Sequence, residues 1–243
     1  MIFKSEHLTQ ASGSIGGVTY GRAKGGTLYR RARAIPVNPQ TVFQTQVRSS
    51  LTDLVNRWID TLTAVQRTAW NTWGANVLFT NPLGEANPIS GQNAYIGANT
   101  ARLAADSKLA LVPILDRVDD APTIFDRGDF TTPVITSYTV AGGFDMEFTS
   151  TDDWAGEVGG AMLIYQGRPR NTSRLFFKGP WRLIGAILGA VVPPSTPFTE
   201  TAAQIAIDGF PLVAGQLIST KVVVVRADGR WSSERKLADT IVA

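Results

Sequence analysis

Cysteine is absent from this sequence of 243 residues, and histidine occurs once, as His7. The lack of cysteine excludes disulfides and thiolate metal sites, and it leaves few of the usual nucleophile–base pairs. Long apolar runs are also missing, because the longest, Leu183–Val192, falls far short of the roughly 20 residues that cross a bilayer. The start MIFKSEHLTQ has no apolar segment of the signal-peptide type. We therefore expect a soluble protein with no membrane partner.

Acidic residues are missing from the stretch between Gly13 and Asn38, GSIGGVTYGRAKGGTLYRRARAIPVN, which carries six glycines and five cations. Glycine increases the entropy lost on folding and like charges repel, so this stretch cannot form a core by itself. Residues 1–38 carry a net charge of +5, which leaves −2 for the rest of a chain whose total is +3. Such a basic arm suits phosphates or an acidic neighbouring subunit, and a solvated tail is the alternative.

Aromatic and apolar side chains in this arm alternate with glycines and cations. The pattern favours extended strands, or a loose hairpin about residues 24–26, over a helix. The side chains expected to make the arm's contacts are Tyr20, Arg22, Tyr29, Arg30, Arg31 and Arg33. Protein subunits are the expected partner, while phosphate contact and base stacking by a nucleic acid form a second reading.

Helical periodicity begins after the arm. Asn38 is a good helix cap and Pro39 suits the first helical position, so a helix is predicted to start there. Apolar residues then recur every three or four positions as far as Leu62. Thr63 and Gln66 have the spacing of a capping box, which predicts that a second helix starts at once.

The second predicted helix carries Trp70 and Trp73, which are expected to pack in a core between helices. Ser90 is predicted to cap a third helix. Residues 109–133 are broken by prolines and aspartates and are interpreted as a linker.

From Val134 onward the apolar period changes to alternation, and Gly and Pro separate the segments. This pattern predicts six to eight short antiparallel strands, with Asp228-Gly229 as a tight hairpin turn. The expected strands are 134–140, 144–150, 160–167, 174–179, 181–191, 216–228 and 229–237.

The predicted fold class is therefore α+β. Its expected parts are an extended basic arm (1–38), a helical domain of three helices (39–108), the linker (109–133) and an antiparallel β-sandwich of the Ig or fibronectin-III type (134–243).

Catalytic chemistry finds little support in this sequence. Asp145 and Glu147 are two apart on one predicted strand, an arrangement that any half-exposed strand shows. No carboxylate pair or ligand cluster has the spacing of an active site, so we expect no enzyme activity, no metal and no cofactor. A carbohydrate-binding module or hydrolase would need an exposed aromatic platform, for which the candidates are Trp154, Trp181 and Trp231.

Three segments carry a resemblance to a known group of proteins: GSIGGVTYGRAKGGTLYRRARAIPVNPQT (13–41), QRTAWNTW (66–73) and SGQNAYIGANTARL (90–103). They resemble phage and prophage-encoded proteins of structural or unknown function. Those proteins share a glycine-rich start, a Pro-x-Asn-Pro segment, a Gln-Arg-x-Ala-Trp helix and a Gly-x-Asn-x-Tyr helix. The motifs cover residues 13–103, and the C-terminal half is similar only in its expected architecture.

This resemblance implies a structural component of a bacteriophage particle, localised in the virion after assembly in the host cytoplasm. We expect a minor capsid or head-decoration (cement) protein whose arm binds the major capsid protein or other virion subunits, together with self-association. The alternatives are a tail or neck structural protein and a nucleic-acid-binding protein that uses the basic arm.

Overall fold

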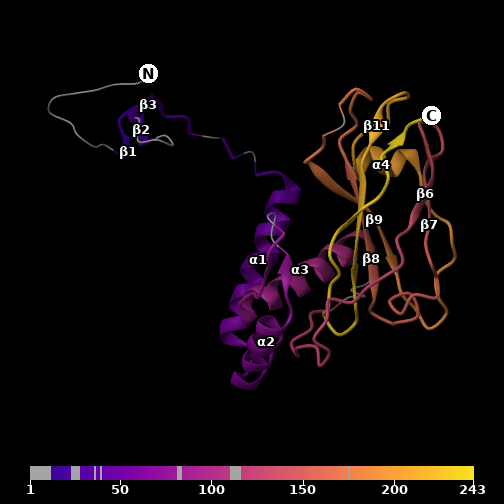
Figure 1. Ribbon diagram of the computed structural model, residues 1–243, viewed down its shortest axis with the longest axis horizontal. Coiled ribbons are helices and arrows are strands. Elements are labelled where there is room, and N and C mark those ends of the chain that lie inside the picture. Colours follow the sequence, from indigo (N-terminus) through magenta and orange to yellow (C-terminus); the bar gives the residue numbers. More distant parts are fainter. Residues whose placement is uncertain are drawn as a thin grey trace. The chain divides into compact units, whose positions relative to one another are not determined.

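The structure is a computed structural model that describes residues 12–22, 28–35, 37–38, 40–80, 84–109, 116–174 and 176–243. These residues form four helices and fourteen strands, and every strand pair among them is antiparallel. This mixture of helices and antiparallel sheets agrees with the predicted α+β class (Figure 1). The chain divides into two compact units, residues 1–45 and 46–243.

The first unit contains a three-stranded antiparallel sheet in the order β1-β2-β3. Its strands are β1 (Gly13–Ile15), β2 (Val18–Arg22) and β3 (Leu28–Ala32). Gly16 has a φ of 58° in the tight turn between β1 and β2, a left-handed conformation that favours glycine. The prediction of strands rather than a helix is confirmed here, while residues 24–26, the expected turn, lie outside the described residues.

Three helices follow, and the start of the first differs from the prediction. They are α1 (Val42–Asp60), α2 (Ala64–Asn76) and α3 (Gly91–Leu109). The cap of α1 is Thr41, whose Oγ1 accepts from Gln44 N at 3.4 Å. Asn38 instead accepts from Gln40 N in the preceding turn. The predicted start at residue 39 is therefore wrong, because Gln40 has a φ of 46°, which no helix contains.

The caps of the next two helices are confirmed. Thr63 and Gln66 form the reciprocal capping box of α2, and Ser90 Oγ accepts from Asn93 N at 3.3 Å at the start of α3. Trp70 and Trp73 of α2 are fully buried. The residues of this helical core are Leu54, Leu62, Trp70, Trp73, Val77, Ala94, Tyr95 and Ala98.

The segment after α3, as far as residue 133, has no helix or strand among its described residues. Its backbone nevertheless accepts hydrogen bonds from two buried tryptophans of the helices: Trp70 Nε1 donates to Asp119 O at 2.8 Å, and Trp73 Nε1 donates to Ile124 O at 3.0 Å. Its other end meets the sheets, where Arg235 Nη1 donates to Phe130 O at 2.6 Å. Residues 46–243 form one compact unit, and the predicted boundaries at 39, 109 and 134 stay predictions.

Two antiparallel sheets dominate the C-terminal half. The three-stranded sheet, in the order β10-β7-β6, contains β6 (Val134–Thr139), β7 (Gly143–Glu147) and β10 (Phe198–Glu200). The four-stranded sheet, in the order β13-β12-β8-β9, contains β8 (Ala161–Gly167), β9 (Trp181–Leu188), β12 (Thr220–Val225) and β13 (Arg235–Lys236). Two short pairs complete the set: β4 (Phe79–Thr80) with β5 (Ala86–Asn87), and β11 (Leu217–Ile218) with β14 (Thr240–Ile241).

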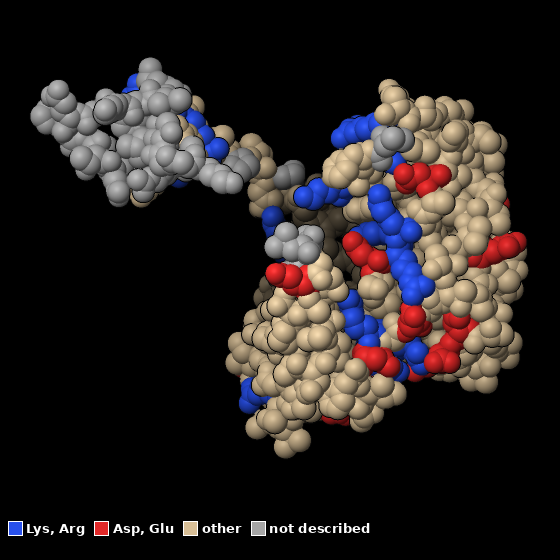
Figure 2. All heavy atoms as spheres, viewed as in Figure 1, with Lys and Arg blue, Asp and Glu red and all other residues tan. Residues whose placement is uncertain are grey.

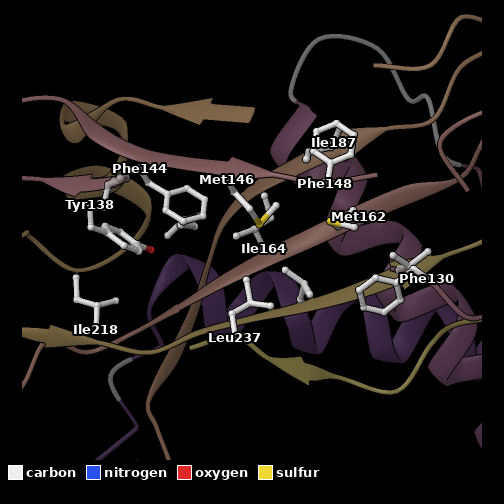
Figure 3. Packing of buried hydrophobic residues seen from close by; sticks show 14 of the residues in the cluster. Phe130, Tyr138, Phe144, Met146, Phe148, Met162, Ile164, Ile187, Ile218 and Leu237 are labelled. Atoms are coloured by element: carbon white, nitrogen blue, oxygen red, sulfur yellow. The ribbon is translucent and has the colours of Figure 1, made fainter. Parts of the chain in front are cut away.

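The main core takes side chains from both of the larger sheets. Phe144 and Met146 of β7 lie close to Met162 and Ile164 of β8, as Figure 3 shows. Alternate residues of β8 belong to a second cluster, in which Leu163 packs with Ala105 of α3. Because neighbouring residues of a strand point to opposite faces, one face of the four-stranded sheet lines the main core and part of the other face is covered by α3.

Several predicted strands differ from those observed. The described residues of 174–179 form no strand; instead the ring of Phe177 packs against Gly167 of β8. The segment 216–228 is split into β11 and β12, and 229–237 forms a strand only at Arg235–Lys236. The hairpin turn at Asp228-Gly229 is confirmed, with Arg226 N donating to Arg230 O at 2.8 Å.

One helix was not expected. It is α4 (Ala202–Asp208), and Thr201 caps it by accepting from Gln204 N at 3.2 Å.

Candidate interaction surface

The residues predicted to make the arm's contacts lie on or next to the sheet β1-β2-β3. Tyr20 of β2 is directly opposite Arg30 of β3, and Thr19 is opposite Arg31. Directly opposed residues of an antiparallel pair share a face, and successive residues alternate between faces. The sheet therefore presents Tyr20 with Arg30 on one face, and Tyr29 with Arg31 on the other.

Tyr29 depends on a glycine in the neighbouring strand. It is opposite Gly21, and a Cβ atom at position 21 would lie 2.7 Å from the Tyr29 Oη and Cζ atoms. A side chain at position 21 would therefore collide with the ring. Gly21 is what allows this tyrosine to lie across β2.

The two other residues predicted to make contacts, Arg33 and Arg22, are placed mainly by their backbone hydrogen bonds and strand pairing. Arg33 follows β3, and its N–H donates to Gly17 O at 2.8 Å, so the pairing with the β1–β2 turn continues past the strand. Arg22 pairs through its backbone with Leu28, but its side chain, like the whole of Lys24, lies outside the described residues.

This sheet has no core of its own among the described residues. None of the described side chains of 12–45 is buried, and Ile15 and Ile35 are 79% and 75% exposed. A small sheet in water is stable only when an apolar face packs against something else. The described side chains of residues 12–45 therefore supply no apolar core for this sheet.

Both edges of the sheet are open within the described part of the chain. The strand order places β1 and β3 at the two edges, with β2 between them. An edge strand presents a row of N–H and C=O groups with which another strand can pair. The sequence has no acidic residue between Glu6 and Asp53, and Arg30, Arg31 and Arg33, on or next to the edge strand β3, are exposed.

The carboxylates considered for catalysis lie on β7. Asp145 is half-buried between Ser137 and Thr199 of the neighbouring strands, and Glu147 is exposed. Among the described residues no three His, Asp or Glu side chains are grouped so that they could hold a metal ion. The absence of enzyme activity stays a prediction.

The three tryptophans proposed as a glycan platform have different surroundings. Trp154 is fully buried, and Trp231 packs against Trp73 and Phe79 with ring centroids 5.5 and 5.2 Å apart. Trp181 is half-exposed, but the ammonium groups of two lysines lie over its ring. None of the three therefore offers an open platform.

Sequence reasoning overlooked a second basic region. No acidic residue occurs between Glu157 and Glu200, and the cations in this interval are Arg168, Arg170, Arg174, Lys178 and Arg182. This imbalance is visible in the sequence, although the alternating apolar pattern of the same segments indicates only buried strands. In Figure 2 basic side chains gather over part of the larger unit, with acidic side chains among them.

Comparisons of this chain with protein families, curated proteins and solved structures found no match. No helix in the described part of the chain is both long enough and apolar enough to cross a membrane.

Proposed function

We propose that this chain is a non-enzymatic structural component of a bacteriophage particle, a minor capsid or head-decoration (cement) protein that binds neighbouring subunits through its N-terminal sheet. The observation that carries the proposal is the sheet β1-β2-β3, which has open edges and no buried residue among those described. A segment of this kind gains stability only on another surface.

Strand addition is the proposed mode of contact. A strand of a neighbouring subunit pairs with the edge of β1 or β3, so that main-chain hydrogen bonds supply affinity. Arg31 and Arg33 are exposed and would meet acidic side chains of that neighbour, with the major capsid protein as the leading candidate. Many such contacts, repeated around a closed shell, hold weakly interacting subunits together.

In this proposal residues 46–243 form the globular domain that carries the N-terminal sheet. Its two main antiparallel sheets contribute to one core, which supports a β-sandwich of the Ig or fibronectin-III type. The protein would act in the virion, after assembly in the host cytoplasm, and would also contact other copies of itself.

The test compares the full chain with a variant that lacks residues 1–35, each produced during particle assembly. Full-length protein should sediment with purified particles, and the truncated protein should stay in the soluble fraction with an unchanged thermal unfolding transition. The proposal is contradicted if the full-length protein never enters particles, or if the truncated protein enters them equally well.

A tail or neck component is the second candidate, because open sheet edges would also link subunits in a ring. Symmetry separates the two assignments. Copies at icosahedral positions support the head protein, whereas sixfold or twelvefold rings support the tail or neck protein.

A nucleic-acid-binding arm is the third candidate, and the pairing of Tyr20 with Arg30 favours it, since aromatic and cationic groups lie side by side. It predicts tight, steeply salt-dependent DNA binding that is lost when Arg30, Arg31 and Arg33 are changed to Glu.

A further inference from the structure

A second surface lies on the four-stranded sheet, on the same face that α3 covers in part. Leu163 of β8 packs with Ala105 of α3. Further along β8 the face carries Tyr165, which is opposite Lys221 of β12, and Lys221 is in turn opposite Lys236 of β13. The alternation of each strand brings these side chains to one face.

Two more rings complete this surface, which we call the cationic face (Tyr165, Phe177, Trp181, Lys221 and Lys236). Trp181 of β9 is opposite Gly167. The Phe177 ring packs against the Cα of Gly167 and meets Trp181 edge-on, with ring centroids 4.9 Å apart. The Lys221 Nζ lies 5.1 Å from the Trp181 ring centroid, and the Lys236 Nζ lies 5.9 Å from it.

The charge on this face is not balanced by its own acids. Lys221 forms an ion pair with Glu234 at 2.5 Å, and the nearby Asp239 is paired with Arg170 at 2.6 Å. Lys236 has no acidic partner among the described residues; its Nζ donates to Phe177 O at 3.5 Å and lies over the Phe177 and Trp181 rings. None of these contacts neutralises the charge, so Lys236 can also bind an anion outside the chain.

The loop before β9 adds an exposed aromatic side chain between two more cations. Phe176 is 74% exposed, and Arg174 and Lys178 are exposed on either side of it in the sequence. Neither cation has an acidic partner in the described part of the chain. An exposed phenylalanine flanked by unpaired cations suits a ligand that has both a flat apolar face and negative charge.

We propose that the cationic face, together with Arg174, Phe176 and Lys178, binds single-stranded nucleic acid. Phosphates would contact Arg174, Lys178 and Lys236, and an unpaired base would stack on Phe176. Cations that follow the backbone and rings that stack on bases are the two components of single-strand recognition.

The other ligand classes fit less well. A duplex keeps its base faces inside the stack, which leaves no partner for Phe176. An acidic peptide would pair with Arg174 and Lys178 but would offer no flat group to stack on the ring of Phe176. A neutral glycan would need the face of Trp181, over which the ammonium groups of Lys221 and Lys236 already lie.

The test measures binding of a fluorescent 15-nucleotide oligothymidylate to the full-length chain by fluorescence anisotropy at low salt. The double variant R174E/K178E should weaken binding about tenfold or more and flatten the salt dependence, because two phosphate contacts are reversed. Phe176→Ala should weaken binding by a similar factor and leave the salt slope unchanged, because stacking is not ionic.

The matched control is R31E/R33E, which makes the same change of charge on the N-terminal sheet and should leave oligothymidylate binding within about twofold. Circular dichroism verifies that each variant is folded. The proposal is overturned if the oligonucleotide does not bind, if only R31E/R33E abolishes binding, or if duplex DNA or polyglutamate competes as well as unlabelled oligothymidylate. Because no residue of this surface belongs to the N-terminal sheet, none of these outcomes decides the proposed structural role.

Discussion

The guanidinium of Arg57 donates two hydrogen bonds to the carboxylate of Asp119, from Nε to Oδ1 at 2.8 Å and from Nη2 to Oδ2 at 2.6 Å. Asp119 also accepts from Tyr95 Oη at 3.2 Å, and its backbone oxygen accepts from Trp70 Nε1 at 2.8 Å. One residue of the segment after α3 thus contacts all three helices of the helical core. Charged, bidentate pairs of this kind are the strong ones among protein hydrogen bonds.

Replacing Asp119 with Asn should lower the free energy of unfolding at pH 7 by roughly 2 kcal/mol, since the charged partner of Arg57 is lost. Hydrogen bonding from Arg57 holds the pKa of Asp119 below its ordinary value of 3.8. A lowered pKa contributes stability that is present above the unfolded-state pKa and is lost as pH falls through the folded-state pKa. Urea unfolding should therefore show a difference in unfolding free energy between wild type and D119N that narrows as the pH falls below 3.8.

The control is Asp120→Asn, because Asp120 is exposed and bonds only to Gln66 Nε2 among the contacts described for its side chain. It should change stability by less than about 0.5 kcal/mol. If D120N and D119N behaved alike, Asp119 would not be the residue that joins the helices.

Arg102 is a buried cation that binds carbonyl oxygens. Its Nε donates to Asp116 O at 2.9 Å, and its Nη1 donates to Gly159 O at 3.0 Å and Arg226 O at 2.8 Å. Burial lowers its pKa. Arg102→Met should cost roughly 3 kcal/mol of unfolding free energy, because three partly buried backbone carbonyls lose their donor. Arg168→Met, at an exposed site, is the control for thermal unfolding; equal losses would refute this role for Arg102.

Gly21 allows Tyr29 to lie across the N-terminal sheet, so Gly21→Ala should displace that ring. We expect reduced incorporation into particles and no change in the thermal transition of the larger unit. Gly17→Ala is the matched control, because a Cβ there has no atom within 4 Å. Immunoblots of purified particles give the comparison, and equal incorporation of both variants would argue against a contact through Tyr29.

Lys236→Glu should weaken oligonucleotide binding. It removes a cation of the cationic face that has no acidic partner among the described residues and places a negative charge where a phosphate would bind. Fluorescence anisotropy measures the binding, and circular dichroism on the same sample verifies that the variant is folded. A folded variant that bound equally well would contradict the account of the cationic face.

The sequence was most informative where the signal is local. The capping box at Thr63 and Gln66 is predictable because its two residues are three apart in the sequence. The start of the first helix is not, because two good caps, Asn38 and Thr41, lie close together and no local signal predicts the left-handed backbone at Gln40. The helix α4 was missed although Thr201 and Gln204 have capping-box spacing.

Contacts between distant segments were beyond sequence reasoning. The apolar residues next to Phe177 predict a strand at this position. In the structure the Phe177 ring instead packs on Gly167 of β8, and the pairing of β8 with β9 places Gly167 opposite Trp181. The cationic face depends on the same pairing, since Lys221 and Lys236 become neighbours only through the register of β12 and β13. For the N-terminal sheet, the composition indicated the exposed basic surface, whereas the opposition of Tyr20 and Arg30 required the structure.

The most direct measurement is a cryo-electron microscopy map of the assembled particle at a resolution that separates strands. The account predicts that residues 12–35 lie against a different polypeptide, with a strand of that subunit paired to β1 or β3. A map in which this sheet is enclosed entirely by residues 46–243 of its own chain would contradict it.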